Sequence, residues 1–244
     1  MAFAPLPARR CFYRHRDGGR MTSPRADMAG RPPVLVLGAG PLGCQVTEGL
    51  LKLGVRHIVV VDASSVSPSD VDGCHFGQSD VGVRGCAEVL ANRYIGNPDL
   101  HILALKTEIR RLEGWRYDLV LSCSRTVEDR LRVNGRVREY HVPLVDGVAS
   151  GSRGRVQVVL PYGPCLGCVL SARGTSPLEP ADPGVVSAVA ERMLFEAMRI
   201  IGGEQDECTE GIVYISGPDL EQTTLALGVS ATCPLHGDEK WRRP

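Results

Sequence analysis

The stretch VLVLGAGPLG, residues 34–43, decides the fold. Four apolar residues followed at once by glycines are typical of a strand buried on both faces of a parallel sheet. The glycines match the spacing G-x-G-x-x-G, and a helix is expected to start at about residue 43. A second apolar run, IVVV at 58–61, ends at Asp62. This order of strand, glycine loop, helix and strand predicts a nucleotide-binding α/β unit.

Apolar runs and helical periodicity continue to alternate after this unit, as expected for parallel strands joined by crossover helices. After residue 146 the pattern changes to alternating strands and one long apolar helix. We therefore predict an α/β fold: a doubly wound, mostly parallel, Rossmann-like sheet extended by antiparallel strands. The further strands are expected at 101–105, 117–121, 143–145, 154–160, 212–215 and 223–227, and the further helices at 87–94, 127–140 and 185–201.

Composition limits the classes of function. The 244 residues include 28 basic and 28 acidic side chains, and 43% are apolar, enough for the core of one domain. A net charge of zero argues against a protein that binds nucleic acid through bulk charge. No apolar run is long enough to span a membrane. We expect no nucleic-acid or membrane partner and a cytoplasmic location.

The charge is unevenly distributed along the chain. Residues 1–31 hold seven Arg and two Asp and show no apolar periodicity. This composition predicts a disordered, Arg-rich tail, with a transit peptide or an over-extended start as the alternatives. Residues 32–244 are expected to form the single folded domain, which then carries a net charge of −5.

Each glycine of the loop has an expected role. Gly38 allows the tight turn, Gly40 lets the backbone approach a phosphate, and Gly43 lets helix and strand pack closely. Asp62, at the end of the next strand, is placed to hold ribose hydroxyls. These four residues are the predicted nucleotide-binding residues. The alternative is that the glycines serve only the turn and the packing.

Two short motifs suggest a metal. Cys165 and Cys168 form a C-x-x-C, and Cys233 and His236 form a C-x-x-H. A gap of two residues lets both side chains of a motif face one ion, and two such motifs give the four ligands of a structural zinc site. A redox C-x-x-C is the alternative, but that chemistry favours a pair at a helix start near a βαβ unit.

Together and in this order, the motifs resemble the ThiF/MoeB/HesA superfamily, which is related to ubiquitin-activating enzymes. The resemblance runs from about residue 34 to 237. It is carried by VLVLGAGPLGCQVTEGLLKLGVRHIVVVD, by DVG at 80–82, YDLVLSC at 117–123, HVPLVDG at 141–147, GRVQVVLPYGPCLGC at 154–168, PGVVSAVAERMLFEAMRIIGG at 183–203 and TCPLH at 232–236.

The resemblance implies a chemistry. Members bind ATP with magnesium and adenylate a C-terminal carboxylate. That carboxylate belongs to a small ubiquitin-like or sulfur-carrier protein, or to a ribosomal peptide. Relatives are commonly dimers, so the resemblance implies a homodimer or a heterodimer with an active relative.

The sequence departs from the family pattern where phosphates and metal are handled. The second acid of the family's D-x-D is Ser64 here, and the expected arginine is Gly73. The flanking asparagines are Asp70 and Asp72, whose charges would repel phosphate. The family's magnesium-holding aspartate aligns with Arg125.

Two cations are left as candidates for that chemistry. Arg84 occupies the region of the family's lysine after D-I-G, and Arg125 lies after the fourth parallel strand. We name both as candidate catalytic residues, with solvated surface arginines as the alternative. The crossover loop at 171–184 contains no cysteine, so the usual thiol acceptor is missing there.

The leading hypothesis from the sequence is a ThiF-type pseudoenzyme. It binds the C-terminal tail of a carrier protein or a leader peptide as a non-catalytic or weakly catalytic partner subunit. The second is an active adenylyltransferase that uses ATP and magnesium for sulfur or acyl transfer. The third is an NAD-dependent oxidoreductase, which would explain Asp62 and the glycine loop but not the cysteine pairs.

Overall fold

The computed structural model describes most of the predicted domain. The predicted tail at 1–31 and the candidate residue Arg84 lie outside the described residues. The described ranges are 32–73, 76–82, 85–94, 97, 99–112, 115–170 and 178–236.

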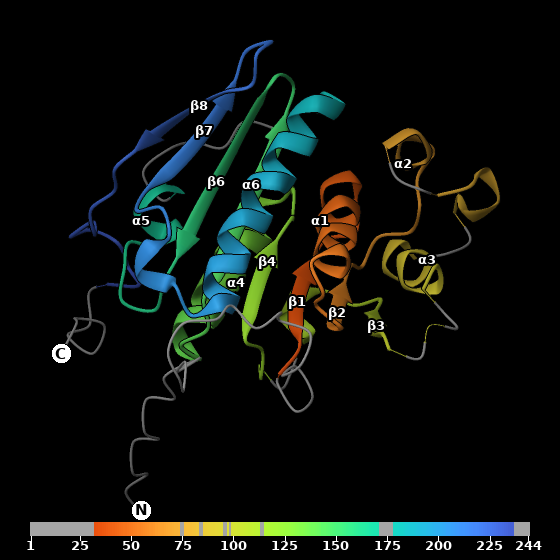
Figure 1. Ribbon diagram of the computed structural model, residues 1–244, viewed down its shortest axis with the longest axis horizontal. Coiled ribbons are helices and arrows are strands. Elements are labelled where there is room, and N and C mark those ends of the chain that lie inside the picture. Colours follow the sequence, from red (N-terminus) through yellow and green to blue (C-terminus); the bar gives the residue numbers. More distant parts are fainter. Residues whose placement is uncertain are drawn as a thin grey trace, which may run out of the picture.

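One eight-stranded sheet runs through the molecule in the order β3-β2-β1-β4-β5-β6-β7-β8 (Figure 1). The first five strands in that order are parallel, and the last three join antiparallel. This confirms the predicted Rossmann-like sheet with an antiparallel extension. The strands are β1 (Val34–Leu37), β2 (His57–Val61), β3 (His101–Leu105), β4 (Leu119–Ser122), β5 (Leu144–Ser150), β6 (Arg153–Val159), β7 (Ile212–Ser216) and β8 (Glu221–Leu225).

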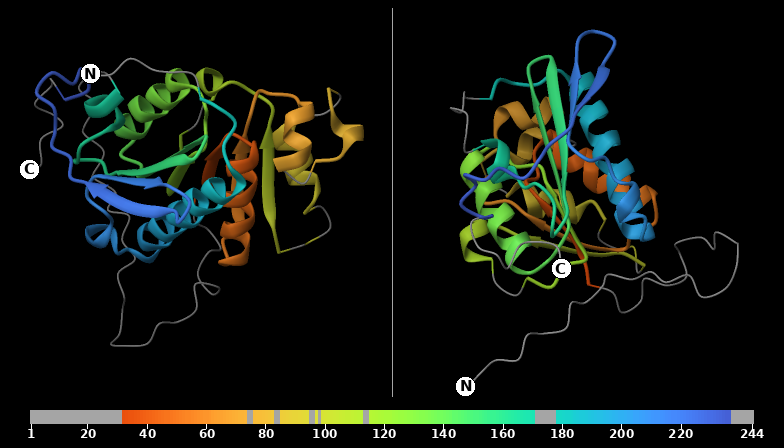
Figure 2. Two further views of the ribbon diagram at one scale, coloured as in Figure 1. Left: turned by 90° about the horizontal axis from the view of Figure 1, so that it is seen from above. Right: turned by 90° about the vertical axis from the view of Figure 1, so that its left-hand side faces the viewer.

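Helices cover both faces of the sheet. Figure 1 shows α1 and α6 side by side on one face, and the view from above in Figure 2 places α4 on the opposite face. Apolar side chains alternate along β1, so Val34 and Val36 join the core under α1 and α6 while Leu35 and Leu37 join the core under α4. The helices are α1 (Pro41–Lys52), α2 (Pro68–Gly73), α3 (Cys86–Asn92), α4 (Val127–Glu139), α5 (Leu166–Leu170) and α6 (Pro183–Gly202), with 3₁₀ turns at Gln78–Asp80, Ile109–Arg111 and Gln205–Glu207.

Helix α6 packs on the antiparallel half through glycines. A Cβ built at Gly147 on β5 would lie 2.1 Å from Met193 Sδ, and one at Gly154 on β6 would lie 2.3 Å from Val189 Cγ2. The missing side chains therefore let α6 approach the sheet closely. Because side chains alternate along a strand, the intervening residues of β5 and β6 point to the opposite face.

Local signals set the ends of the helices that border the site. Thr126 caps α4, because its Oγ1 accepts a hydrogen bond from Asp129 N at 3.2 Å. Helix α6 ends at Gly203, whose φ of +82° lies in the left-handed region that favours glycine. Within the described ranges, no helix is both long and apolar enough to cross a bilayer.

Candidate functional site: a glycine loop, a buried ion cluster and a cysteine–histidine cluster

The glycine loop joins β1 to α1 at the carboxyl end of the parallel strands. Gly38 has a φ of +92°, in the left-handed region, and a Cβ at Gly43 would lie only 1.9 Å from Gly38 O. Those two glycines are therefore required by the turn and by the helix–strand packing. A Cβ at Gly40 would meet nothing within 4 Å. Gly40 thus borders open space, as expected for the residue that approaches a phosphate.

Asp62 lies beside this loop. Its Oδ2 accepts a hydrogen bond from Ala39 N at 2.7 Å, and its Oδ1 accepts one from Ser64 N at 2.7 Å. The carboxylate therefore ties the end of β2 to the glycine loop. Each carboxylate oxygen has a second lone pair, which leaves capacity for a ribose hydroxyl.

Arg125 lies just beyond the carboxyl end of β4. Its Nη2 donates to Leu178 O at 3.0 Å and to Glu179 O at 3.4 Å. The same segment is held by Glu179 N, which donates to Ser150 Oγ at 2.9 Å, and by the pairing of Gly151 with Ala181. The structure thus places Arg125 as a tether of the chain that leads into α6.

Asp70 and Asp72, which stand where the family pattern has asparagines, lie on α2. The carboxylate of Asp70 accepts hydrogen bonds from Ser67 N at 2.8 Å and from Ser67 Oγ at 2.6 Å. Asp70 therefore caps its own helix.

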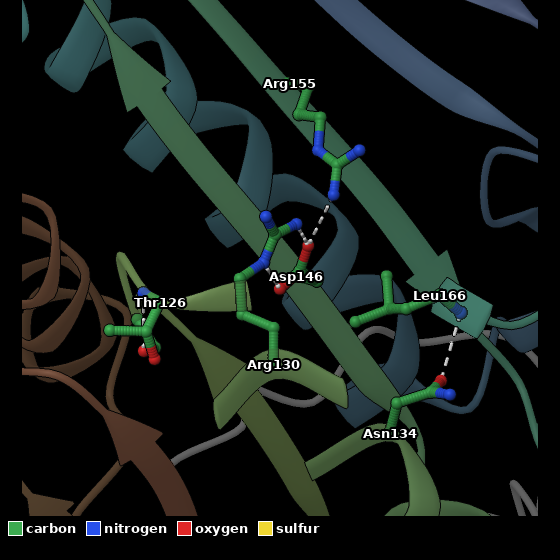
Figure 3. Close-up of polar contacts among 7 residues, drawn as sticks. Thr126, Arg130, Asn134, Asp146, Arg155 and Leu166 are labelled. Atoms are coloured by element: carbon green, nitrogen blue, oxygen red, sulfur yellow. Dashed lines mark hydrogen bonds and ion pairs between the residues drawn. The ribbon is translucent and has the colours of Figure 1, made fainter. Parts of the chain in front are cut away.

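A buried ion cluster lies where β5 and β6 pair (Figure 3). Asp146 is fully buried and accepts two hydrogen bonds from Arg130, one from Nε at 2.9 Å and one from Nη2. Arg155 on β6 points to the same carboxylate, with Nη2 3.6 Å from Asp146 Oδ2. The cluster therefore holds two guanidinium groups against one carboxylate.

The pKa shifts follow from this arrangement. Burial alone would raise the pKa of the Asp146 carboxyl, but the charge and hydrogen bonds of Arg130 hold that pKa below its ordinary value. Burial and the nearby Arg130 charge lower the pKa of the Arg155 guanidinium, and Asp146 opposes this only in part. Arg130 is therefore satisfied by the carboxylate, whereas the charge of Arg155 is not fully compensated.

The two cysteine motifs meet in space, as the sequence predicts. The Sγ atoms of Cys165, Cys168 and Cys233 and Nδ1 of His236 all lie within 4.8 Å of one another. Cys165 Sγ lies 4.0 Å from Cys168 Sγ and 3.7 Å from Cys233 Sγ, and His236 Nδ1 lies 3.4 Å from Cys168 Sγ. A tetrahedral zinc ion with Zn–S bonds of about 2.3 Å would place its sulfur ligands about 3.8 Å apart. The spacing of these donor atoms therefore fits one tetrahedral ion.

The surroundings of the cluster also suit metal ligands. His236 Nε2 lies 3.2 Å from Gly163 O, an arrangement that leaves Nδ1 free to bind an ion. A Cβ at Gly167 would lie 3.0 Å from Cys233 Sγ, so the glycine between the two cysteines of the first motif makes room for the sulfurs. Cys165 directly precedes a short helix, α5, which the sequence did not predict. A position at a helix start is what a redox C-x-x-C favours. A redox pair does not explain why Cys233 and His236 lie beside these two cysteines.

Comparison with known proteins defines the class. The ThiF family model matches residues 25–235, so the chain belongs to the ThiF family. The molybdopterin-synthase adenylyltransferase of Escherichia coli is 27% identical over 216 residues, which cover 84% of this chain and 86% of the relative. The SAMP-activating enzyme E1 of Haloferax volcanii is 25% identical over 218 residues, which cover 84% of this chain and 80% of that enzyme.

Solved structures agree on the fold. The crystal structure of E. coli MccB with ATP has a TM-score of 0.71 and 15% sequence identity, and the match covers 85% of this chain and 67% of that one. E. coli MccB with MccA-N7isoASN has a TM-score of 0.70 at 14% identity, with the same coverage. The ThiF family model and the adenylyltransferase relatives confirm the predicted superfamily.

Proposed function

We propose that this chain is a ThiF-family protein that binds the C-terminal tail of a carrier protein or peptide and contributes little or no adenylation. The observation that carries the proposal is the placement of Arg125. The family pattern has a magnesium-holding aspartate at this position. Here a guanidinium stands there and is bonded to the carbonyls of Leu178 and Glu179. A cation at this point opposes the binding of a divalent metal.

Other residues support reduced catalysis. Ser64 is a neutral side chain where the family has a second acid, and the carboxylate of Asp70 is engaged with Ser67. The open space beside Gly40 and the position of Asp62 next to the glycine loop support nucleotide binding. The arginine expected from the family pattern is Gly73 here, so one cation is missing. Loss of one cation that stabilises a transition state costs about 10³-fold or more in rate, and we therefore expect nucleotide binding with slow chemistry.

The test is ATP–pyrophosphate exchange with a panel of candidate carrier tails. We expect exchange no faster than in a Gly40→Trp control, whose bulky side chain would fill the open space above the loop. Gly40 suits this control because its Cβ direction is clear of protein atoms, so the variant should still fold. Exchange well above the control would overturn the proposal.

An active adenylyltransferase is the second candidate. It is favoured by the relatives, of which several are named adenylyltransferases, among them the E. coli sulfur carrier protein ThiS adenylyltransferase at 26% identity over 219 residues. It predicts that Arg84→Ala abolishes AMP release that depends on a carboxylate. Unchanged AMP release in that variant would remove the role given to Arg84. Binding of NADH in a fluorescence titration would instead support the oxidoreductase.

For the cysteine–histidine cluster we propose a structural zinc site with four protein ligands. The support is the set of donor distances given above. A closed set of four ligands leaves no open position for water or substrate, so the role is to hold the segments around residues 165 and 233 together. One zinc ion per chain, measured by elemental analysis, is the expected stoichiometry.

The partner of such a chain would be either a second copy or an active relative. The mass of the purified chain in solution distinguishes these two alternatives. Light scattering of the purified chain at micromolar concentration separates a homodimer from a monomer that awaits a different subunit.

A further inference from the structure

Helix α4 carries a row of polar side chains on its buried face. Arg130, Asn134 and Arg138 follow one another at intervals of four residues, so they share one side of the helix. All three side chains are buried. Arg130 binds Asp146 in the ion cluster, whereas the other two have hydrogen-bond partners beside the cysteine–histidine cluster. The helix therefore reaches the candidate metal site through Asn134 and Arg138.

Asn134 holds the backbone of the first cysteine motif. Its Oδ1 accepts a hydrogen bond from Leu166 N at 3.0 Å, and Leu166 directly follows Cys165 in the chain (Figure 3). Because a backbone N–H can only donate, this contact fixes which end of the Asn134 amide carries the oxygen. The other end is therefore the Nδ2 group, which carries two N–H donors.

The Nδ2 group of Asn134 lies beside two of the cluster's sulfurs. A Cβ built at Gly167 would lie 3.0 Å from Cys233 Sγ, 3.4 Å from Cys165 Sγ and 3.8 Å from Asn134 Nδ2. The amide nitrogen and both sulfurs thus border the same point. Nδ2 is buried and has no hydrogen-bond partner among the described residues. A buried donor without a partner costs free energy, so this position calls for an acceptor that the fold alone does not supply.

Metal binding would supply that acceptor. A cysteine thiol is a weak acceptor, but cysteine binds zinc as a thiolate, and hydrogen bonds to an ionised group are about twice as strong as neutral ones. Three thiolates and a neutral histidine around a divalent ion leave one negative charge in excess. Because Cys165 and Cys233 are buried, water cannot solvate this charge at their sulfurs. The amide donors of Asn134 are placed to stabilise it.

Arg138 supports the histidine of the second motif in a similar way. Its Nη1 donates to Gly163 O at 3.1 Å, and His236 Nε2 lies 3.2 Å from the same oxygen. The guanidinium therefore holds the carbonyl that orients the imidazole ring. Helix α4 thus contacts both halves of the cluster, the first motif through Asn134 and the second through Arg138 and Gly163.

We propose that Asn134 is a positioning residue for the metal ion, although it is not a ligand. Its Oδ1 fixes the backbone of the first motif, and its Nδ2 donates hydrogen bonds to the metal-bound thiolates of Cys165 and Cys233. This inference rests on the proposed zinc site. It adds to that site a residue from a different element, which the spacing within the two motifs does not indicate.

The test replaces zinc by cobalt(II) in the full chain and records the charge-transfer absorption from thiolate to metal. A hydrogen bond lowers the energy of the sulfur lone pairs, so its loss should move this band to longer wavelength. Asn134→Leu, which is similar in size and lacks both donor and acceptor, should show the shift and bind zinc about 10–100-fold more weakly. Thr47→Val is the matched control, because it removes a buried, unpartnered hydroxyl on α1, across the sheet from α4. It should leave the band and the zinc affinity unchanged.

A second variant isolates the donor. Asn134→Asp keeps an oxygen for Leu166 N but replaces Nδ2 by a second oxygen, so it should move the band in the same direction. If only Asn134→Leu moves the band, the contact with Leu166 acts alone and the bond to the thiolates is wrong. Should Asn134→Leu fail to fold, Asn134→Asp decides by itself, and an unchanged band overturns the inference. A wild-type chain that binds neither zinc nor cobalt would instead refute the zinc site, and the role of Asn134 with it.

Discussion

At the scale of single residues, the glycine loop separates folding from ligand binding. Gly43 is fixed by packing, because any side chain there overlaps Gly38 O, while Gly40 faces open space. The two positions are three residues apart and differ in what a methyl group would meet. A pair of alanine variants therefore reports on two different properties.

Gly43→Ala is expected to lower the free energy of unfolding by about 1–3 kcal/mol or more, the usual cost of overpacking. Gly40→Ala should leave it within about 0.5 kcal/mol. Urea unfolding followed by circular dichroism measures both. Equal losses in the two variants would contradict the roles assigned to these glycines.

Asp146 gives a prediction about pH. Asp146→Asn leaves Arg130 buried without its charge partner, and we expect a loss of about 3–5 kcal/mol at pH 7. The pKa of Asp146 is lowered in the folded state, so the stabilisation is complete above the carboxyl's ordinary pKa of about 4 and is lost as the pH falls toward the folded value. The difference between wild type and variant should therefore shrink below about pH 4.

The control for this series is Glu139→Gln, which breaks an exposed pair with Arg136. Its cost should stay below about 1 kcal/mol at every pH. If the difference in the free energy of unfolding between wild type and Asp146→Asn grows as the pH falls, the stabilising role assigned to the Asp146 carboxylate is wrong.

At the scale of elements, Arg125 links the end of β4 to the segment before α6. Removal of its exposed hydrogen bonds should cost about 0.5–1.5 kcal/mol locally. Arg125→Ala is thus expected to speed amide exchange in residues 178–182 by about 2- to 10-fold and to leave the central strands unchanged. Arg132→Ala, which removes an exposed arginine of α4, is the control and should leave that segment as it was.

The sequence predicts the strands well where both faces are buried. The run at 34–37 is apolar throughout because β1 lies between two layers of helices, so its bounds are confirmed. Helices α2 and α5 span six and five residues, too few turns for an apolar stripe to show, and neither was predicted.

Strand β5 shows why part of the site was missed. The sequence indicated a strand at 143–145 because the apolar run stops at Asp146, but β5 continues to Ser150. The charge of Asp146 is buried because Arg130 and Arg155 reach it from α4 and β6, and no local pattern reports such distant partners. By contrast, the spacing within each cysteine motif was enough to predict the cluster.

At the scale of the whole molecule, the cysteine–histidine cluster joins segments that are far apart in the sequence. Between its two motifs lie α6, β7 and β8. A bound ion would therefore stabilise most of the antiparallel half. Burial raises the pKa of the Cys233 thiol, and a bound cation would favour its thiolate form.

Metal removal gives the corresponding prediction. Dialysis against a strong chelator, or His236→Gln, should lower the thermal midpoint by at least about 5 °C, equal to roughly 2 kcal/mol for a domain of this size. Cys208→Ala changes a buried cysteine outside the cluster and should keep one zinc per chain. Full zinc content in the His236→Gln variant would exclude His236 as a ligand.

The same cluster has a consequence for synthesis on the ribosome. His236 follows Cys168 by 68 residues, so the fourth ligand emerges long after the first two. At about 5–20 residues per second, Cys165 and Cys168 wait about 3–14 s for their partners. During that interval the nascent chain displays a pair of uncommitted thiols, and its yield should depend on how reducing the cell is while translation is under way.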